Sequence, residues 1–161
     1  MSRDEFIARF GGIFEHSPWI AAGAYDAGLG PEAATAEGLH AALCRVLDAA
    51  DRAAKLALLN AHPDLAGKLA LARQLTAEST AEQAGAGLDR LTPEELARFT
   101  VLNDAYKARF GHPFIIAVKG LDKHGILAAF ERRIGHSPEV EFETALAEVK
   151  RIALLRLQAL A

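Results

Sequence analysis

Residues 92–111 read TPEELARFTVLNDAYKARFG, and this stretch decides the fold class. Thr92 is a residue type that caps helices, Pro93 suits the first helical position, and Glu95 completes a capping box with Thr92. Apolar residues then recur at intervals of three and four, at Leu96, Phe99, Leu102, Tyr106 and Phe110. Gly111 follows as a typical helix stop. The stretch therefore predicts one long amphipathic helix.

The rest of the chain follows the same spacing, with abundant alanine and little valine or threonine, which favours helix throughout. We expect further helices to begin at Ser2, Ser17, Asp122 and Ser137, with one long helix from Leu39 to about Asn60 and two more over 65–75 and 76–85. The short apolar run 114–118 follows a proline and predicts an extended connector. The predicted fold is an all-α, single-domain multi-helix bundle of residues 1–161, with one short extended segment near 113–118.

The size and composition fit one domain with its own core: 161 residues, 51% hydrophobic and 24% charged. The formal net charge is −3 and the basic residues form no stripe, so we expect no nucleic-acid partner. Cys44 is the single cysteine, which excludes an internal disulfide or a thiolate zinc site and fits a reducing compartment. The start has acidic side chains and no apolar run, and no stretch reaches the roughly 18 apolar residues of a membrane span. We expect a cytoplasmic protein without membrane contact.

A few polar residues interrupt the apolar pattern and are candidates for chemistry. His62 precedes Pro63, which disfavours helical geometry and places His62 at a bend between helices. A histidine there can equally bond the last carbonyls of a helix. Asn103 is a second polar residue in apolar helical sequence. The six histidines have no ligand spacing typical of metal sites, so no metal is expected.

The other candidates have structural alternatives as well. Glu82 and Gln83 could complete capping boxes with Ser79 and Thr80. Arg109 could complement the dipole at its helix terminus, but it lies about 20° from Leu102 around the helix by the geometry of 3.6 residues per turn, which suits an anchor for a buried anion. Cys44 and Trp19 are expected in the core.

Read as strings, these residues resemble the OHCU decarboxylases, enzymes of ureide metabolism downstream of urate oxidation. The resemblance covers nearly the whole chain in order, through residues 15–19 (EHSPW), 60–66 (NAHPDLA), 75–84 (LTAESTAEQA), 102–106 (LNDAY), 109–116 (RFGHPFII), and Arg151 and Arg156 with their apolar neighbours. Residues 28–35 and His136 are less typical of the family, and neither is expected to contact the site.

The resemblance implies an all-helical homodimer that converts 2-oxo-4-hydroxy-4-carboxy-5-ureidoimidazoline (OHCU) to (S)-allantoin and carbon dioxide without metal or organic cofactor. It implies that His62 is the catalytic histidine, acting on the C4 hydroxyl or as a proton shuttle, with its ring aimed by the Pro63 bend. Glu82 would be its carboxylate partner, and a nearby carboxylate favours the protonated imidazole.

The same resemblance implies a set of substrate-binding residues, which includes Pro63. Arg109 would hold a pair of substrate oxygens through its planar fork, and Ser79 and Gln83, one helical turn apart, would address the ureido group. Unpaired backbone N–H groups at Ile116 and Val118 would be further donors. Two alternatives stay open: a non-catalytic helical interaction domain, in which these residues are caps and surface features, and a metal-dependent amidohydrolase acting on another ureide.

Overall fold

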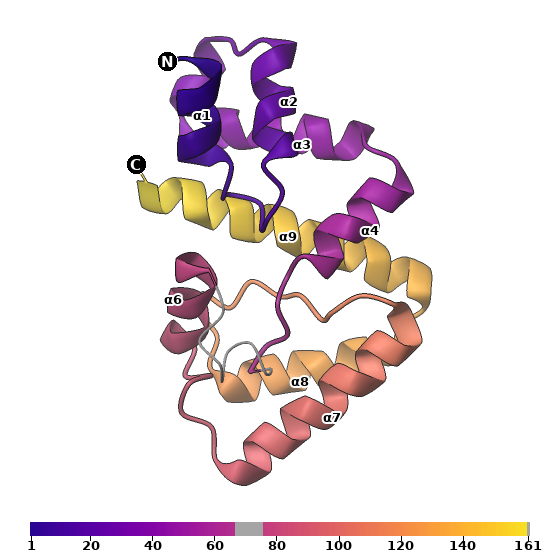
Figure 1. The fold of residues 1–161 in the computed structure, drawn as a ribbon. Helices are drawn as coiled ribbons and strands as arrows, with labels where there is room; N and C mark the ends of the chain where they lie inside the picture. The colour runs from indigo at the N-terminus through magenta and orange to yellow at the C-terminus, as the bar shows by residue number, and fades with distance from the viewer. Residues whose placement is uncertain (67–75, 161) are drawn as a thin grey trace. The chain divides into compact units, whose positions relative to one another are not determined.

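The computed structural model describes residues 1–66 and 76–160, and these residues form helices and connectors without a strand, which confirms the all-α prediction. The helices are α1 (Arg3–Phe10), α2 (Trp19–Ala27), the 3-10 turn η1 (Pro31–Ala34), α3 (Ala36–Ala49), α4 (Arg52–Asn60), α6 (Ala77–Gly85), α7 (Pro93–Phe110), α8 (Lys123–Arg133) and α9 (Pro138–Leu160) (Figure 1). The helix expected around Leu69, Ala72 and Leu75 lies outside the described residues. No helix in 1–66 or 76–160 is both long and apolar enough to cross a membrane.

Contacts divide the chain into two compact units, Met1–Ala61 with Val149–Ala161, and His62–Glu148. Every residue that the sequence singles out for catalysis or substrate binding belongs to the second. The first contains α1 to α4 and the later turns of α9, and the second contains α6 to α8 and the first turns of α9. We call them the terminal unit and the central unit.

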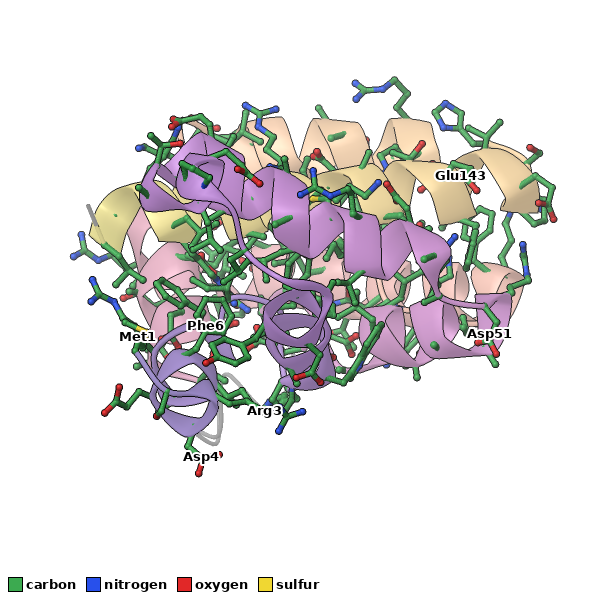
Figure 2. The ribbon with its side chains drawn as sticks, turned by 90° about the horizontal axis from the view of Figure 1, so that it is seen from above. Met1, Arg3, Asp4, Phe6, Asp51 and Glu143 are labelled. Carbon is green, nitrogen blue, oxygen red and sulfur yellow. The ribbon has the colours of Figure 1, made fainter. Side chains whose placement is uncertain are left out.

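The terminal unit begins with the predicted capping box, in which Ser2 Oγ accepts from Glu5 N and Glu5 accepts from Ser2 N. Phe6 and Asp4 extend from opposite sides of α1 (Figure 2), and Phe6 is buried in contact with Tyr25 of α2. The α2 cap differs from the prediction: α2 begins at Trp19, and Ser17 Oγ donates to the Glu15 carbonyl instead of capping the helix.

Two further sequence predictions for the terminal unit are wrong. The long helix expected from Leu39 to Asn60 is two helices, because α3 ends at Ala49 and Asp51 caps a new helix by accepting from Ala54 N at 2.8 Å. An aspartate that bonds a backbone N–H two or three residues on competes with a continuous helix. Trp19, expected in the core, keeps 38% of its surface exposed.

The central unit is built on α7 and α8, which lie side by side (Figure 1). The capping box of Thr92 and Glu95, the first-position Pro93 and the left-handed Gly111 (φ 79°) all confirm the predicted ends of α7. Asp122 caps α8 as predicted. The core is formed by Leu65, Ala66, Ala86, Leu88, Phe99, Leu102, Tyr106, Phe114, Val118, Ile126, Ala129 and Phe130.

The predicted extended connector is present over 113–118, without helix or strand hydrogen bonding. Its apolar side chains attach it to the core: the Phe114 ring stacks on Phe130 of α8 with centroids 3.9 Å apart. Stacked aromatic rings contribute beyond their buried area, which here holds an irregular segment against two helices.

Candidate functional site

The candidate site begins with the turn that follows α4. Ala61 ends α4, and His62, Pro63 and the residues up to Ala66 are not helical, which confirms the predicted bend. His62 is 9% exposed. Ala66 has a φ of 54°, a left-handed conformation that costs a residue with a Cβ about 1–2 kcal/mol. Other contacts must therefore hold the turn that carries His62.

Two buried amides supply those contacts. Gln83 Oε1 accepts from Ala66 N at 3.1 Å, and Gln83 Nε2 lies 3.5 Å from the Asp64 carbonyl, to which it donates. Asn103 Nδ2 donates to the Leu65 carbonyl at 2.9 Å. Since Gln83 is on α6 and Asn103 on α7, the backbone beside His62 is fastened to two helices.

Helix α6 places Ser79, Glu82 and Gln83. Its cap is Thr76, whose Oγ1 accepts from Ser79 N at 3.2 Å, so the alternative of capping boxes built on Ser79 and Thr80 is wrong. Ser79 and Gln83 are buried on one face, as their spacing predicts, and Glu82 is half-buried beside them. The helix thus brings Gln83 onto the His62 turn and presents Ser79 on the same side.

Arg109 lies in the last turn of α7 and its side chain is exposed. Its Nη2 donates to the His136 carbonyl at 2.9 Å, and its guanidinium lies 5.1 Å from the Phe110 ring centroid. The expectation that His136 does not contact candidate site residues is therefore wrong. Among the described residues, none forms an ion pair with Arg109.

Ile116 and Val118 lie in the extended connector, Ile116 half-buried and Val118 buried. Within the described chain no acceptor bonds either backbone N–H. Between them, Ala117 N donates to Glu148 Oε1 at 3.4 Å.

The sequence analysis missed a buried polar cluster behind this connector. Glu141 of α9 is fully buried and its Oε1 accepts from Tyr106 Oη at 2.6 Å and from Arg133 Nε at 2.9 Å. Arg133 Nη1 donates to the Ile115 carbonyl at 2.6 Å, and His136 Nδ1 lies 3.0 Å from Glu141 Oε2. Burial and the bond to Glu141 raise the pKa of Tyr106 far above its ordinary value, so its hydroxyl stays a donor.

One signal in the sequence could have revealed this cluster. Glu141 stands directly beside Phe142 and one turn before Ala145, on the apolar face of the last helix. A carboxylate at such a position requires a cationic partner, because an isolated buried charge is costly.

No group of three or more potential metal ligands occurs among residues 1–66 and 76–160.

The comparisons with known proteins decide the family. The sequence model described as "OHCU decarboxylase" matches residues 1–158. The chain belongs to the OHCU decarboxylase family. A relative named 2-oxo-4-hydroxy-4-carboxy-5-ureidoimidazoline decarboxylase from Haloferax volcanii is 44% identical over 154 residues, which cover 96% of this chain and 88% of the relative.

Two further comparisons agree with this assignment. The mouse protein of that name is 38% identical over 98% of this chain and 86% of its own length. The crystal structure of an (S)-allantoin synthase matches with a TM-score of 0.77 and 35% identity, covering 99% of this chain and 50% of that chain. The resemblance seen in the motifs thus extends to sequence and fold over nearly the full length.

Proposed function

We propose that the chain decarboxylates OHCU to (S)-allantoin, using its own side chains without metal or organic cofactor. The observation that carries the proposal is the family match over residues 1–158, which includes the His62 turn, α6, Arg109 and the connector. Chemically, the substrate supplies its own electron sink. The bond from C4 to the carboxylate breaks, carbon dioxide leaves, and the electron pair moves toward the ring C=N bond to give an enol-like intermediate.

His62 handles the proton in this proposal. It takes the proton of the C4 hydroxyl or delivers a proton to one face of the intermediate, which sets the configuration of the product. Glu82 is the carboxylate partner that favours the protonated imidazole. The fastening of residues 64–66 by Gln83 and Asn103 supports this role, because proton transfer requires a ring held in one orientation.

The remaining residues bind the substrate. Gln83 keeps one amide hydrogen and one oxygen lone pair beyond its two bonds to the turn, and these suit a ureido group together with Ser79. The exposed fork of Arg109 suits an oxygen pair of the substrate. The N–H groups of Ile116 and Val118 are donors for oxygen atoms that gain charge as carbon dioxide leaves.

The proposal also includes a cytoplasmic homodimer folded as one domain. The single cysteine supports a reducing compartment, and the single family match from residue 1 to residue 158 supports one domain. The homodimer is what the family resemblance implies. Light scattering on the purified protein is expected to give the mass of two chains, and the mass of one chain would contradict the dimer.

The function is tested with freshly generated OHCU. We expect loss of OHCU and release of carbon dioxide at initial rates proportional to protein concentration, above the spontaneous rate. A non-catalytic interaction domain would leave the spontaneous rate unchanged. A metal-dependent amidohydrolase would instead release ammonia from a ureide and lose that activity with chelator.

A further inference from the structure

We propose that the buried Arg133–Glu141 ion pair positions the substrate-binding groups. Arg133 holds the connector 113–118, and Glu141 supports Arg109 through His136. Neither residue touches the substrate; they act through the backbone that does. The inference rests on the proposed function, because it assigns Ile116, Val118 and Arg109 to substrate binding.

Arg133 contacts the connector just before Ile116. Arg133 Nη1 donates to the Ile115 carbonyl at 2.6 Å, and its guanidinium lies 4.4 Å from the Phe114 ring centroid. One side chain thus fixes two successive residues directly before Ile116. Since no helix or strand hydrogen bonds fix the connector, these contacts set the direction of the N–H groups that follow.

The pair is also linked to Arg109. Glu141 uses both carboxylate oxygens: Oε1 accepts from Arg133 and Tyr106, and Oε2 lies 3.0 Å from His136 Nδ1. The carbonyl of His136 in turn accepts from Arg109 Nη2 at 2.9 Å. A single carboxylate therefore connects, through short contacts, to both groups of substrate donors.

Burial limits what the Arg133–Glu141 pair contributes to the free energy of unfolding. The Arg133 and Glu141 side chains are 4% and 0% exposed, and Arg133 Nη2 is buried without a partner among the described residues. Replacing a buried ion pair by apolar side chains of similar volume is often neutral or stabilising, so stability alone does not account for this pair. What such a pair does provide is a fixed geometry, and here it fixes the connector.

The main test is Arg133→Lys, with Arg132→Lys as the matched control. Lysine keeps the charge beside Glu141, but its compact ammonium group cannot reproduce the fixed guanidinium geometry that bonds both that carboxylate and the Ile115 carbonyl. Arg132 is the exposed neighbour on the same helix. We expect Arg133→Lys to raise KM for OHCU about tenfold with little change in kcat, and the control to match wild type.

A second readout does not depend on catalysis. Amide hydrogen exchange at Ile116, Ala117 and Val118 is expected to be about tenfold faster in Arg133→Lys than in Arg132→Lys, with unchanged exchange in the middle of α7. If wild-type protein fails to turn over OHCU, the proposed function fails while this readout still tests the positioning. Wild-type KM together with wild-type exchange in folded Arg133→Lys would overturn the inference.

His136→Ala keeps the test decisive if Arg133→Lys does not fold. The His136 side chain is 39% exposed, so its removal leaves the core intact, yet it takes away one contact of Glu141 and the ring beside the Arg109 acceptor. We expect a KM increase of about threefold for OHCU, with a melting temperature near that of wild type. An unchanged KM in this variant would also overturn the inference.

Discussion

Each of the two compact units contains a buried arginine–glutamate pair, and the two pairs are built alike. In the central unit Arg133 Nε lies 2.9 Å from Glu141, and in the terminal unit Arg156 Nη2 lies 3.2 Å from Glu15. All four side chains are less than a tenth exposed. In both pairs the same guanidinium also donates to the backbone of a segment between helices.

The difference lies in which segment is held. Arg156 Nη1 donates to the carbonyls of Gly12 and Ile13, between α1 and α2, where the sequence predicts no substrate contact. Arg133 donates to Ile115, directly before the candidate donor Ile116. We therefore expect Arg133 to influence substrate binding and Arg156 to influence chiefly the stability of the terminal unit.

The largest expected effect is that of His62→Ala. Loss of a general acid–base group lowers rates by about 10²–10⁴-fold, and a turn residue contributes little packing, so the melting temperature should change little. The matched control is His40→Ala in the terminal unit, where the ring bonds the Lys150 carbonyl at 2.8 Å. Steady-state rates and circular dichroism decide: near wild-type turnover in folded His62→Ala would remove the histidine from the mechanism.

Neutralising Glu15 or Glu141 distinguishes the roles of the two ion pairs. Glu15→Gln and Glu141→Gln should each lower the free energy of unfolding by about 3 kcal/mol, because each leaves a buried guanidinium without its counter-charge. Glu143→Gln is the control, an exposed carboxylate of the same helix as Glu141 (Figure 2). Denaturant unfolding measures the loss, and kinetics per folded molecule should change for Glu141→Gln alone. A raised KM for OHCU in Glu15→Gln would contradict the expected difference between the two pairs.

Arg109→Lys tests whether Arg109 binds the substrate or only interacts with the dipole at the end of α7. If the fork grips the substrate, about 1–3 kcal/mol of transition-state binding disappears, a fall of about 5- to 150-fold in kcat/KM. A residue that only complements the helix terminus loses a few tenths of a kcal/mol in stability and nothing in kinetics. The control is Arg98→Lys, on the same helix and paired with Glu131. Kinetics within twofold of wild type would return Arg109 to a structural role.

Alkaline pH provides a smaller effect that belongs to the central unit. Burial raises the pKa of Tyr106 above its ordinary value of 10.0, so the folded chain holds this proton more tightly than the unfolded chain. The resulting stability is full below pH 10 and is lost as pH rises further, by up to about 1.4 kcal/mol per unit. Unfolding between pH 9 and 11 should show a shallower loss in Tyr106→Phe, with Tyr25→Phe as control; equal slopes in wild type and Tyr106→Phe would contradict this.

The smallest expected effect is that of chelation. Dialysis against EDTA should leave the rate unchanged, because the sequence has no metal-ligand spacing and the substrate carries its own electron sink. Loss of activity that a divalent ion restores would contradict a cofactor-free reaction and would favour the amidohydrolase alternative.

The sequence predicts local features of this chain well. Ser2, Thr92 and Asp122 each form the caps that their neighbours imply, and the bend at His62 follows from the proline after it. These features depend on interactions over three or four residues, which the sequence displays directly. The helix break at Asp51, which the sequence analysis missed, is also a local signal, but the longer apolar stripe concealed it.

Long-range contacts could not be predicted in the same way. Gln83 meets Ala66 over 17 residues and Arg133 meets Ile115 over 18, and spacing in the sequence does not encode such pairs. The exposure of Trp19 and Arg109 likewise depends on which helices pack against them. The candidate catalytic and substrate-binding residues are predicted from sequence motifs, whereas the contacts of the Arg133–Glu141 pair are seen only in the folded structure.

The most direct test of the account is the chirality of the allantoin that forms from freshly generated OHCU. Circular dichroism should show (S)-allantoin with wild-type protein, because protonation occurs on one face of the held intermediate. His62→Ala should give the racemic product of the spontaneous reaction at the spontaneous rate. Racemic allantoin from active wild-type protein, or (S)-allantoin from His62→Ala at the wild-type rate, would contradict the account.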